Sequence, residues 1–396
     1  MRKIAIIGAG PAGFMAGIRC KELYPNFDVT IFDSAKPLAK LLLTGGGRCN
    51  ICNAIFDFKE LAKNYPRGEK FLYSIFNKFD TSDLFNFFEK ANIDLYIQND
   101  NRVFPNTNSA KTIRGALLAI AQQKNIKIKP NFKINELEKK QNSFILNKTL
   151  QFDNVIIATG NNRSGIRLVE ALGHKIIALE PTLCGIKTKN PAPELSGVSI
   201  KAIGTVDKAE FSGELLFTHS GVSGPMIMDI SSILAYKKFP YTLKLNFTSL
   251  KQDSQEQELL EIFYNHPKKN ISNLLTKYLP HSLIENFLEE SNIPKEKKAG
   301  EISRKERAKI ASFLTKKELI LIKKEPNFMV MAGGVALDEV DNNLESKIIK
   351  GLYFAGEILD IDGLCGGFNL QACFSTGFVA GNLSGLDKKG EKYAKS

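Results

Sequence analysis

The sequence predicts an α/β protein in which one domain is interrupted by a long insertion of different character. Three observations support this prediction. Residues 3–33 combine short apolar runs with a glycine-rich turn, residues 185–328 change to antiparallel and then to polar helical patterning, and residues 351–377 return to the style of the start. A length of 396 residues leaves room for two or three domains.

The first residues have the pattern of a strand, a glycine turn, a helix and a second strand. The apolar run KIAII begins at Lys3, the turn GAGPAG follows at 8–13, and FMAGIRCKELY then has the apolar spacing of a helix. A second apolar run, DVTIFD, ends at Asp33, 20 residues after Gly13. This is the context that a dinucleotide-binding glycine turn requires.

The next elements are read from their apolar spacing. Residues 56–92 and 110–125 have the pattern of helices, and RVFPNTNSA at 102–110 reads as a loop. The segment 126–160 has strand and meander patterning and ends in the apolar run VIIATG. Near the other end of the chain, residues 368–383 are expected to form a helix.

The insertion is expected to have two parts. Residues 185–251 together with 317–328 alternate like exposed antiparallel strands, whereas residues 252–316 are polar, lysine-rich and helical in pattern. The remaining segments, 1–184 and 329–396, then form one discontinuous domain.

The composition is that of a globular protein and argues against a membrane protein. The apolar content of 43% and charged content of 24% are ordinary for a globular protein, and no apolar stretch approaches the roughly 20 residues of a membrane helix. The first apolar run is too short for a signal peptide, so we expect a cytoplasmic protein. The net charge of +12 reflects either composition bias or a basic surface, and both suit an anionic ligand. The final segment, 387–396, is expected to be a solvated tail.

The glycine turn supplies the chemistry of a dinucleotide site. Gly8 permits the tight turn after the strand, Gly10 lets the backbone approach a pyrophosphate, and Gly13 lets the helix pack closely. The helix N-terminus offers free N–H groups and a positive dipole end to phosphates. Asp33 can accept hydrogen bonds from both ribose hydroxyls, which disfavours a 2′-phosphate. The alternative is a glycine turn without a ligand.

A distant segment favours FAD over NAD. The run GLYFAGEILDIDGLCGGFNLQ begins at Gly351 and delivers Glu357, an acid suited to ribityl or ribose hydroxyls. The pair Gly366-Gly367 then opens a helix whose dipole can stabilise negative charge on a reduced flavin. The alternative is a buried strand followed by a glycine-capped helix.

A third segment completes the pattern. The strand VIIATG ends in Ala158, Thr159 and Gly160, which are small enough for backbone to pass close to a cofactor. No second G-x-G-x-x-G stands in a strand–helix context, so a dedicated NAD(P)H domain is not expected. If NAD(P)H is the electron donor, it must bind at the flavin face as a substrate does.

The stretch LLLTGGGRCNICN, residues 41–53, leaves several interpretations open. Cys49 and Cys52 could form a redox pair beside a flavin. A structural zinc site needs about four ligands, and a second Cys-X-X-Cys or His pair is missing. The favoured interpretation is a loop around FAD, in which Gly45–Gly47 let backbone approach the cofactor and Lys40 or Arg48 offsets its charge.

These motifs together resemble a bacterial family of NAD(P)/FAD-dependent oxidoreductases that includes aminoacetone oxidase-like and BaiN-like enzymes. The resemblance rests on GAGPAG, TGGGRCN, VIIATG, FTHSGVSGP and GLYFAGEILDIDGLCGGFNLQ, which span nearly the whole chain. It implies a glutathione-reductase-like FAD-binding Rossmann domain split by an inserted β-barrel and a small helical domain, with the flavin at the domain junction. The family often has Glu where this chain has Asp33, and Ser or Thr where it has Cys52.

The expected function is that of a FAD-dependent oxidoreductase that transfers hydride between a small organic substrate or NAD(P)H and flavin N5. The alternatives are a tRNA-modifying flavoprotein, for which the lysine-rich insert is the support, and a FAD-binding protein without turnover. Nucleic acid is not the expected partner, no metal is expected, and the oligomeric state is not predicted. No catalytic residue is assigned, and His219 could be an acid or base or could anchor the insertion. The expected FAD-binding residues are Gly8, Gly10, Pro11, Ala12, Gly13, Asp33, Lys40, Leu41, Thr44, Gly46, Gly47, Arg48, Cys49, Asn50, Ala158, Thr159, Gly160, Gly356, Glu357, Gly367, Phe368, Asn369 and Leu370.

Overall fold

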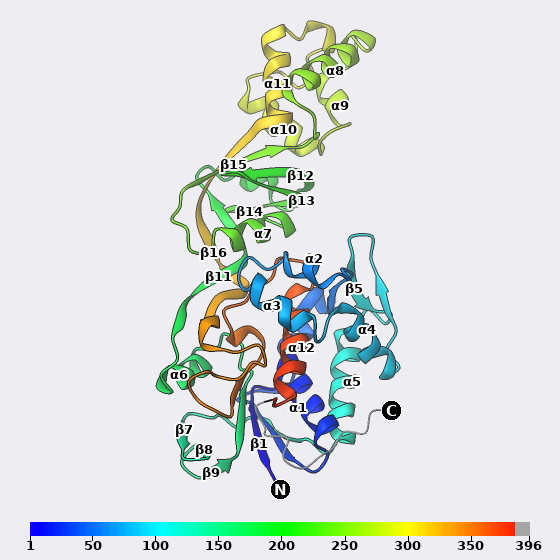
Figure 1. Ribbon diagram of the computed structural model, residues 1–396. Helices are drawn as coiled ribbons and strands as arrows, with labels where there is room; N and C mark the ends of the chain where they lie inside the picture. Colours follow the sequence, from blue (N-terminus) through cyan, green and yellow to red (C-terminus); the bar gives the residue numbers. More distant parts are fainter. Residues whose placement is uncertain (385–396) are drawn as a thin grey trace. The chain divides into compact units, whose positions relative to one another are not determined.

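The computed structural model describes residues 1–384 and divides them into two compact units (Figure 1). One unit joins Met1–Glu180 to the segment that begins at Met331, and the other is Pro181–Val330. The tail expected at 387–396 lies outside the described residues. The finer domain division made from the sequence stays a prediction.

The first unit is built on a five-stranded sheet in the order β17-β10-β1-β2-β6, and every pairing in it is parallel. Its strands are β1 (Lys3–Ile7), β2 (Asp28–Phe32), β6 (Lys127–Lys129), β10 (Asn154–Ile157) and β17 (Leu352–Phe354). The registers pair Ile7 with both Phe32 and Ile157, and Ile157 with Phe354. The carboxyl ends of these four strands therefore lie level at one edge, where ligands of open parallel sheets bind.

Two helices that begin at this edge pack against each other. They are α1 (Pro11–Leu23) and α12 (Phe368–Gly381). A Cβ built on Gly377 would lie 2.4 Å from the Ala12 carbonyl oxygen, and one on Gly381 would lie 2.5 Å from that of Ala16. Glycine on α12 thus permits the close approach of the two helices where the first turns of α1 meet the second half of α12.

The rest of this unit is helical with two small sheets. Its other helices are α2 (Phe58–Ala62), α3 (Glu69–Phe76), α4 (Thr81–Lys90), α5 (Ala110–Gln123) and α6 (Arg163–Ala171), and its short 3-10 turns are η1 (Lys40–Gly47), η4 (Leu337–Glu339) and η5 (Gly356–Ile358). One small antiparallel sheet has the order β3-β5-β4 (Cys52–Asn53, Arg102–Pro105 and Leu95–Ile97), and the other is β7-β8-β9 (Leu137–Lys140, Ser143–Leu146 and Leu150–Phe152). The interpretation of 102–110 as a loop was wrong at its start, because Arg102–Pro105 pairs as a strand.

The second unit contains a closed barrel in the order β11-β14-β13-β12-β15-β16. Its strands are β11 (Ile176–Thr188), β12 (Ser199–Val206), β13 (Ala209–Thr218), β14 (Gly221–Ser223), β15 (Tyr241–Asn246) and β16 (Lys317–Val335), with α7 (Pro225–Ile233) after β14. The helices α8 (Gln252–Asn265), α9 (Ile271–Leu275), α10 (His281–Glu290) and α11 (Arg304–Lys316) and the 3-10 turns η2 (Pro193–Leu195) and η3 (Ala299–Glu301) complete it. A β part followed by a helical part is the organisation that the patterning of this region predicts.

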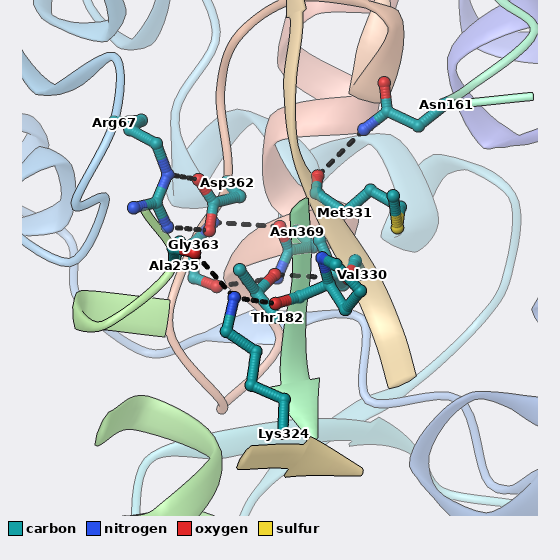
Figure 2. Close-up of polar contacts among 11 residues, drawn as sticks. Arg67, Asn161, Thr182, Ala235, Lys324, Val330, Met331, Asp362, Gly363 and Asn369 are labelled. Carbon is teal, nitrogen blue, oxygen red and sulfur yellow. Dashed lines mark hydrogen bonds and ion pairs between the residues drawn. The ribbon is translucent and has the colours of Figure 1, made fainter. Parts of the chain in front are cut away.

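Polar contacts hold the two long strands of the barrel near its end (Figure 2). Thr182 Oγ1 on β11 donates to the Val330 carbonyl on β16 at 3.2 Å. Lys324 Nζ donates to the Pro181 carbonyl at 3.0 Å and to the Ala235 carbonyl, just after α7, at 2.6 Å. The lysine thereby links β16 to β11 and to the end of α7.

Candidate functional site

The glycine turn after β1 is fixed by steric contacts on two sides. A Cβ built on Gly8, which has φ of +115°, would lie 2.2 Å from the Ala158 carbonyl oxygen at the end of β10. A Cβ on Gly13 would lie 1.9 Å from the Gly8 carbonyl oxygen. Gly10 precedes Pro11 as the N-cap of α1, and no atom lies within 4 Å of its Cβ position. The turn thus closes on the sheet at Gly8 and Gly13 and leaves an open face at Gly10.

Asp33 lies beside this turn at the end of β2. Its carboxylate accepts from the Ala9 N–H at 2.7 Å and from the Ala35 N–H at 2.8 Å. Each carboxylate oxygen has two lone pairs, so both can accept a further donor. The two backbone N–H groups therefore orient the acid at the edge without using all its acceptor capacity.

The glycine triple lies in a kinked 3-10 turn, η1. Gly45, Gly46 and Gly47 have φ of +56°, +67° and +84°. A Cβ on Gly45 would lie 2.7 Å from the Asn50 N atom, whereas nothing lies within 4 Å of that on Gly46. The Arg48 guanidinium lies 4.1 Å from the centroid of the Phe104 ring, a cation–π contact that holds it against the protein.

Hydrogen bonds from the Thr44 segment complete this turn. Thr44 Oγ1 donates to the Leu41 carbonyl at 2.7 Å, and the Cys49 N–H donates to the Thr44 carbonyl at 3.0 Å. Leu41 and Cys49 are buried, while Lys40 and Gly46 are exposed. The turn therefore buries its two ends and presents its glycine backbone outward.

Two asparagines join this segment to the start of α12. With its oxygen oriented toward α12, the Asn50 carboxamide accepts from the Gly367 N–H at 3.1 Å and donates to the Cys52 carbonyl at 3.0 Å. Asn53 Nδ2 donates to the Gly366 carbonyl at 3.4 Å. A Cβ on Gly367 would lie 2.4 Å from the Cys52 carbonyl oxygen. The Asn50 side chain is thus engaged by the protein backbone at this junction.

The end of β10 meets the end of β17. A Cβ on Gly160 would lie 3.6 Å from Glu357 Oε2, and one on Gly356 would lie 2.9 Å from the Cβ of Ala12 on α1. Burial raises the pKa of the Glu357 carboxyl, and the ammonium of Lys40 acts in the opposite direction. Thr159 Oγ1 bonds to the Gly160 carbonyl at 3.2 Å. Residues 8–13, 158–160 and 356–357 therefore converge.

The loop between these strands and α12, residues 359–367, is named the lead-in loop here. Its Asp362 carboxylate receives both Nε and Nη2 of Arg67, and the Asp362 side chain is fully buried (Figure 2). The Asn369 carboxamide accepts from the Gly363 N–H and donates to the Gly363 carbonyl, both at 2.9 Å (Figure 2). Tyr65 Oη donates to the Phe368 carbonyl at 2.6 Å. These contacts fix the lead-in loop and the first residues of α12.

The structure thus gathers nearly all of the sequence-predicted residues at one edge of the sheet. Leu370 lies half-buried in the first turn of α12. Sequence reasoning missed Arg67, which stands in YPRGEK with no motif around it. It also missed Asn161, whose Nδ2 donates to the Met331 carbonyl at 2.8 Å (Figure 2). Asp360 and Asp362 stand inside a motif quoted for Glu357 and its glycine pair, so their carboxylates were a usable signal.

Several buried acceptors at this edge have no hydrogen-bond partner within residues 1–384. They are Asn53 Oδ1, Asn161 Oδ1, Asp360 Oδ1 and Gln371 Oε1. A buried acceptor without a donor costs about 1–3 kcal/mol, so such atoms point to a ligand or water. FAD carries matching donors, the ribityl hydroxyls and the ring N3–H. With the open backbone at Gly10 and Gly46, the residues present fit FAD.

The cysteines of the 41–53 stretch are free thiols in the structure, and both are fully buried. Burial raises the pKa of Cys49 to about 12, against a smaller opposing effect of the Thr44 hydroxyl, and burial also raises the pKa of Cys52. Both thiols are thus protonated at neutral pH, which disfavours thiolate chemistry. Within residues 1–384 no group of three or more His, Cys, Asp and Glu side chains could hold a metal ion.

Replacing Cys52 with Ser is expected to leave the flavin absorption spectrum and the rate of flavin reduction nearly unchanged. The reason is that a protonated, buried thiol neither forms a charge-transfer band with a flavin nor relays electrons to it. Stopped-flow absorbance of the purified variant measures both quantities, with Cys20→Ser as a control for a buried thiol on α1. A large loss of reduction confined to Cys52→Ser would restore the redox-pair hypothesis.

His219 lies in the second unit, exposed at the turn between β13 and β14. The neighbouring Ser220 hydroxyl donates to the Glu325 carboxylate on β16. The hairpin is thus anchored through Ser220, and a role of His219 as acid or base stays a prediction.

The parallel sheet, the glycine turn and the converging strand ends define the class as FAD-dependent oxidoreductases of the Rossmann type. The family model described as "HI0933-like protein Rossmann domain" matches residues 2–383, and the chain belongs to this HI0933-like family. This confirms the family resemblance stated from the motifs. No helix within residues 1–384 is both long enough and apolar enough to cross a membrane.

Curated relatives match over nearly their full length. The chain is 28% identical over 411 residues to a 3-dehydro-bile acid delta(4,6)-reductase of Clostridium scindens, with 97% of this chain and 99% of that protein covered. It is 26% identical over 398 residues to a ribosomal RNA dihydrouridine synthase of Escherichia coli, with 94% and 96% covered. A flavocytochrome c3 fumarate reductase is similar in fold, with a TM-score of 0.50 and 13% identity over 97% of this chain and 78% of that one.

Proposed function

We propose that this protein is a FAD-dependent reductase that saturates a carbon–carbon double bond conjugated to a carbonyl group. The proposal that the cofactor is FAD rests on one observation. At the carboxyl edge of the sheet the glycine backbone is open, and several buried acceptor atoms have no hydrogen-bond partner among the described residues. The printed names of the relatives support the reaction class. A delta(4,6)-reductase of a 3-dehydro bile acid and a dihydrouridine synthase are both named for adding hydrogen across a carbon–carbon double bond.

The proposed FAD site uses the residues predicted from the sequence, in a glutathione-reductase-like arrangement. The N-terminus of α1 and Gly10 would face the pyrophosphate, Asp33 a ribose, and Glu357 the ribityl hydroxyls. FAD, when bound, supplies hydride transfer. NAD(P)H as the electron donor, a small organic molecule as the substrate and a cytoplasmic location belong to the same proposal.

The chain's own residues orient and tune this site. The Asn50 carboxamide and Arg67–Asp362 pair fix the start of α12, so that its N–H groups are held in place before a ligand arrives. Donors and a helix dipole that need no reorganisation stabilise developing negative charge well. Lys40 and Arg48 add positive charge on the same side as the glycine triple.

The test follows the flavin absorbance of the purified protein under anaerobic conditions. We expect NADH or NADPH to bleach the flavin, and an enone, from a panel that also holds amines and uridine, to restore its colour. Product mass should rise by two hydrogens. A protein that carries no FAD and binds none when it is added would contradict the cofactor claim. Flavin that is reduced but never reoxidised by a conjugated double bond would contradict the reaction class.

Reduction of a uracil ring in RNA is the second candidate, and the dihydrouridine synthase relatives favour it. The lysine-rich insert gives it little support, because residues 252–316 hold eleven Lys and Arg against ten Asp and Glu. Some of these lysines are paired, as Lys277 is with Glu258 at 2.6 Å and Lys297 with Glu306 at 2.7 Å. Gel shifts at low salt with ribosomal RNA and tRNA distinguish the candidates, since phosphate contacts weaken steeply with salt.

A further inference from the structure

We propose that Asp360 is the acid that protonates the substrate carbon next to the carbonyl group. This inference rests on the proposed function. Asp360 lies in the lead-in loop, between Glu357 and the start of α12, which are the two segments that the proposed site places at the flavin. An acid on this loop therefore lies at the same edge of the sheet as the proposed FAD site.

The backbone fixes Asp360 and leaves one carboxyl oxygen without a partner. The Asp360 N–H donates to the Val335 carbonyl at 3.1 Å, and the Gly333 N–H bonds to the Asp360 carboxyl. A Cβ on Gly334 would lie 2.4 Å from the Ile358 carbonyl oxygen, so the end of β16 packs closely on the loop. Asp360 Oδ1 is buried and has no partner among the described residues. One oxygen is thus held, and the other can carry a proton.

Burial of the Asp360 carboxyl favours that proton. Nε and Nη2 of Arg67 donate to the two carboxylate oxygens of Asp362 in a two-point contact. Burial raises the pKa of the Asp360 carboxyl. The Arg67 guanidinium acts in the opposite direction, as the Gly333 N–H does, and the Asp362 carboxylate raises the pKa by less than Arg67 lowers it. A carboxyl with a raised pKa holds a larger share of its protons near neutral pH, as a general acid must.

Most other titratable groups at this edge have another role or are inaccessible, and Glu357 is the acid proposed to face the ribityl hydroxyls. The Asp33 carboxylate accepts from two backbone N–H groups. Cys49 and Cys52 are fully buried, and the buried Tyr65 hydroxyl donates to the Phe368 carbonyl. Asp360 is half-buried as a residue, and its Oδ1 is the acid oxygen at this edge that has no partner among the described residues.

Proton transfer from Asp360 is the second half of the addition of hydrogen to the double bond. The electron pair and hydrogen for the carbon distant from the carbonyl would be supplied by reduced FAD when it is bound, and FAD would be oxidised in return. The Asp360 O–H bond breaks, a C–H bond forms at the carbon next to the carbonyl, and the electron pair of the double bond is consumed in it. Solvent then returns a proton to the Asp360 carboxylate.

The test compares Asp360→Asn with the wild type and with Asp338→Asn, an exposed acid on η4 outside the site. We expect Asp360→Asn to bind FAD and to be reduced by NAD(P)H at the wild-type rate. Reoxidation by an enone should slow at least about 100-fold, the usual contribution of a general acid. In the wild type this rate should fall as pH rises through the pKa of Asp360, because the acid must be protonated, and Asp360→Asn should lose that dependence. Asp360→Glu should keep it.

A measurement on the FAD-free protein tests the protonation of Asp360 independently of the reaction. Carbon-13 NMR of labelled aspartate should show one carboxyl that titrates above its ordinary range and is missing from Asp360→Asn. Equal reoxidation of wild type and Asp360→Asn would overturn the inference while the proposed function stands. A wild-type enzyme that reduces no enone would overturn both, and loss of FAD from Asp360→Asn alone would assign the residue to cofactor binding instead.

Discussion

Replacing Gly13 with alanine is expected to unfold the first unit or destabilise it severely, by about 3 kcal/mol or more. A Cβ at this position would lie 1.9 Å from the Gly8 carbonyl oxygen, a backbone atom that cannot move without breaking the turn. Gly8→Ala should behave in the same way, because its Cβ would lie 2.2 Å from the Ala158 carbonyl oxygen at a φ of +115°. Thermal unfolding of the FAD-free proteins measures both losses.

Gly10→Ala should have the opposite profile. Its φ of −86° suits alanine and nothing lies within 4 Å, so the FAD-free protein should lose at most about 1 kcal/mol, the ordinary cost of alanine at an N-cap. The added methyl would stand before the N-terminus of α1, where the pyrophosphate is proposed to approach, and FAD affinity should fall at least about tenfold, or 1.4 kcal/mol. Gly115→Ala, an open glycine inside α5, is the matched control and should not alter FAD binding. Unchanged FAD affinity in Gly10→Ala would refute the proposed place of the pyrophosphate.

The sequence predicted the helices and strands that are determined by the spacing of nearby residues. The strand, turn, helix and strand of the first 33 residues follow from apolar spacing and glycine, and the structure has β1, α1 and β2 there. The strand Arg102–Pro105 was missed because Pro105 and the asparagines after it read as a turn, and because one of its two partners, β3, lies some 50 residues earlier. Pairing between distant segments leaves no periodic signal in either one.

The same distinction applies to the candidate site. Its glycines could be predicted from the sequence, since few other residues tolerate their backbone angles or contacts. The side-chain contacts that hold the segments together could not be predicted. Asn50 reads as a loop residue until its carboxamide is seen to reach Gly367, and Arg67 reads as one basic residue among 54 Lys and Arg until Asp362 is placed beside it.

Arg67→Ala should be the most damaging change outside the glycine turns. The Asp362 side chain is fully buried and that of Arg67 is 16% exposed, so removing the arginine leaves a carboxylate buried without its counter-charge (Figure 2). Breaking such a pair typically costs about 3–5 kcal/mol, which corresponds to a fall in Tm of about 6–20 °C for a unit of this size. Arg102→Ala is the matched control, because its pair with Asp100 is exposed and should contribute at most about 1 kcal/mol.

The double variant Arg67→Ala with Asp362→Asn decides what the pair contributes. If the loss in Arg67→Ala comes from an uncompensated buried charge, removing the charge as well should recover part of the stability, and the double-mutant cycle should give a coupling of about 1 kcal/mol or more. FAD affinity should not recover with it, because the lead-in loop has lost the contact that orients Asp360 and the start of α12. Recovery of both together would mean that the pair stabilises the fold without positioning the site.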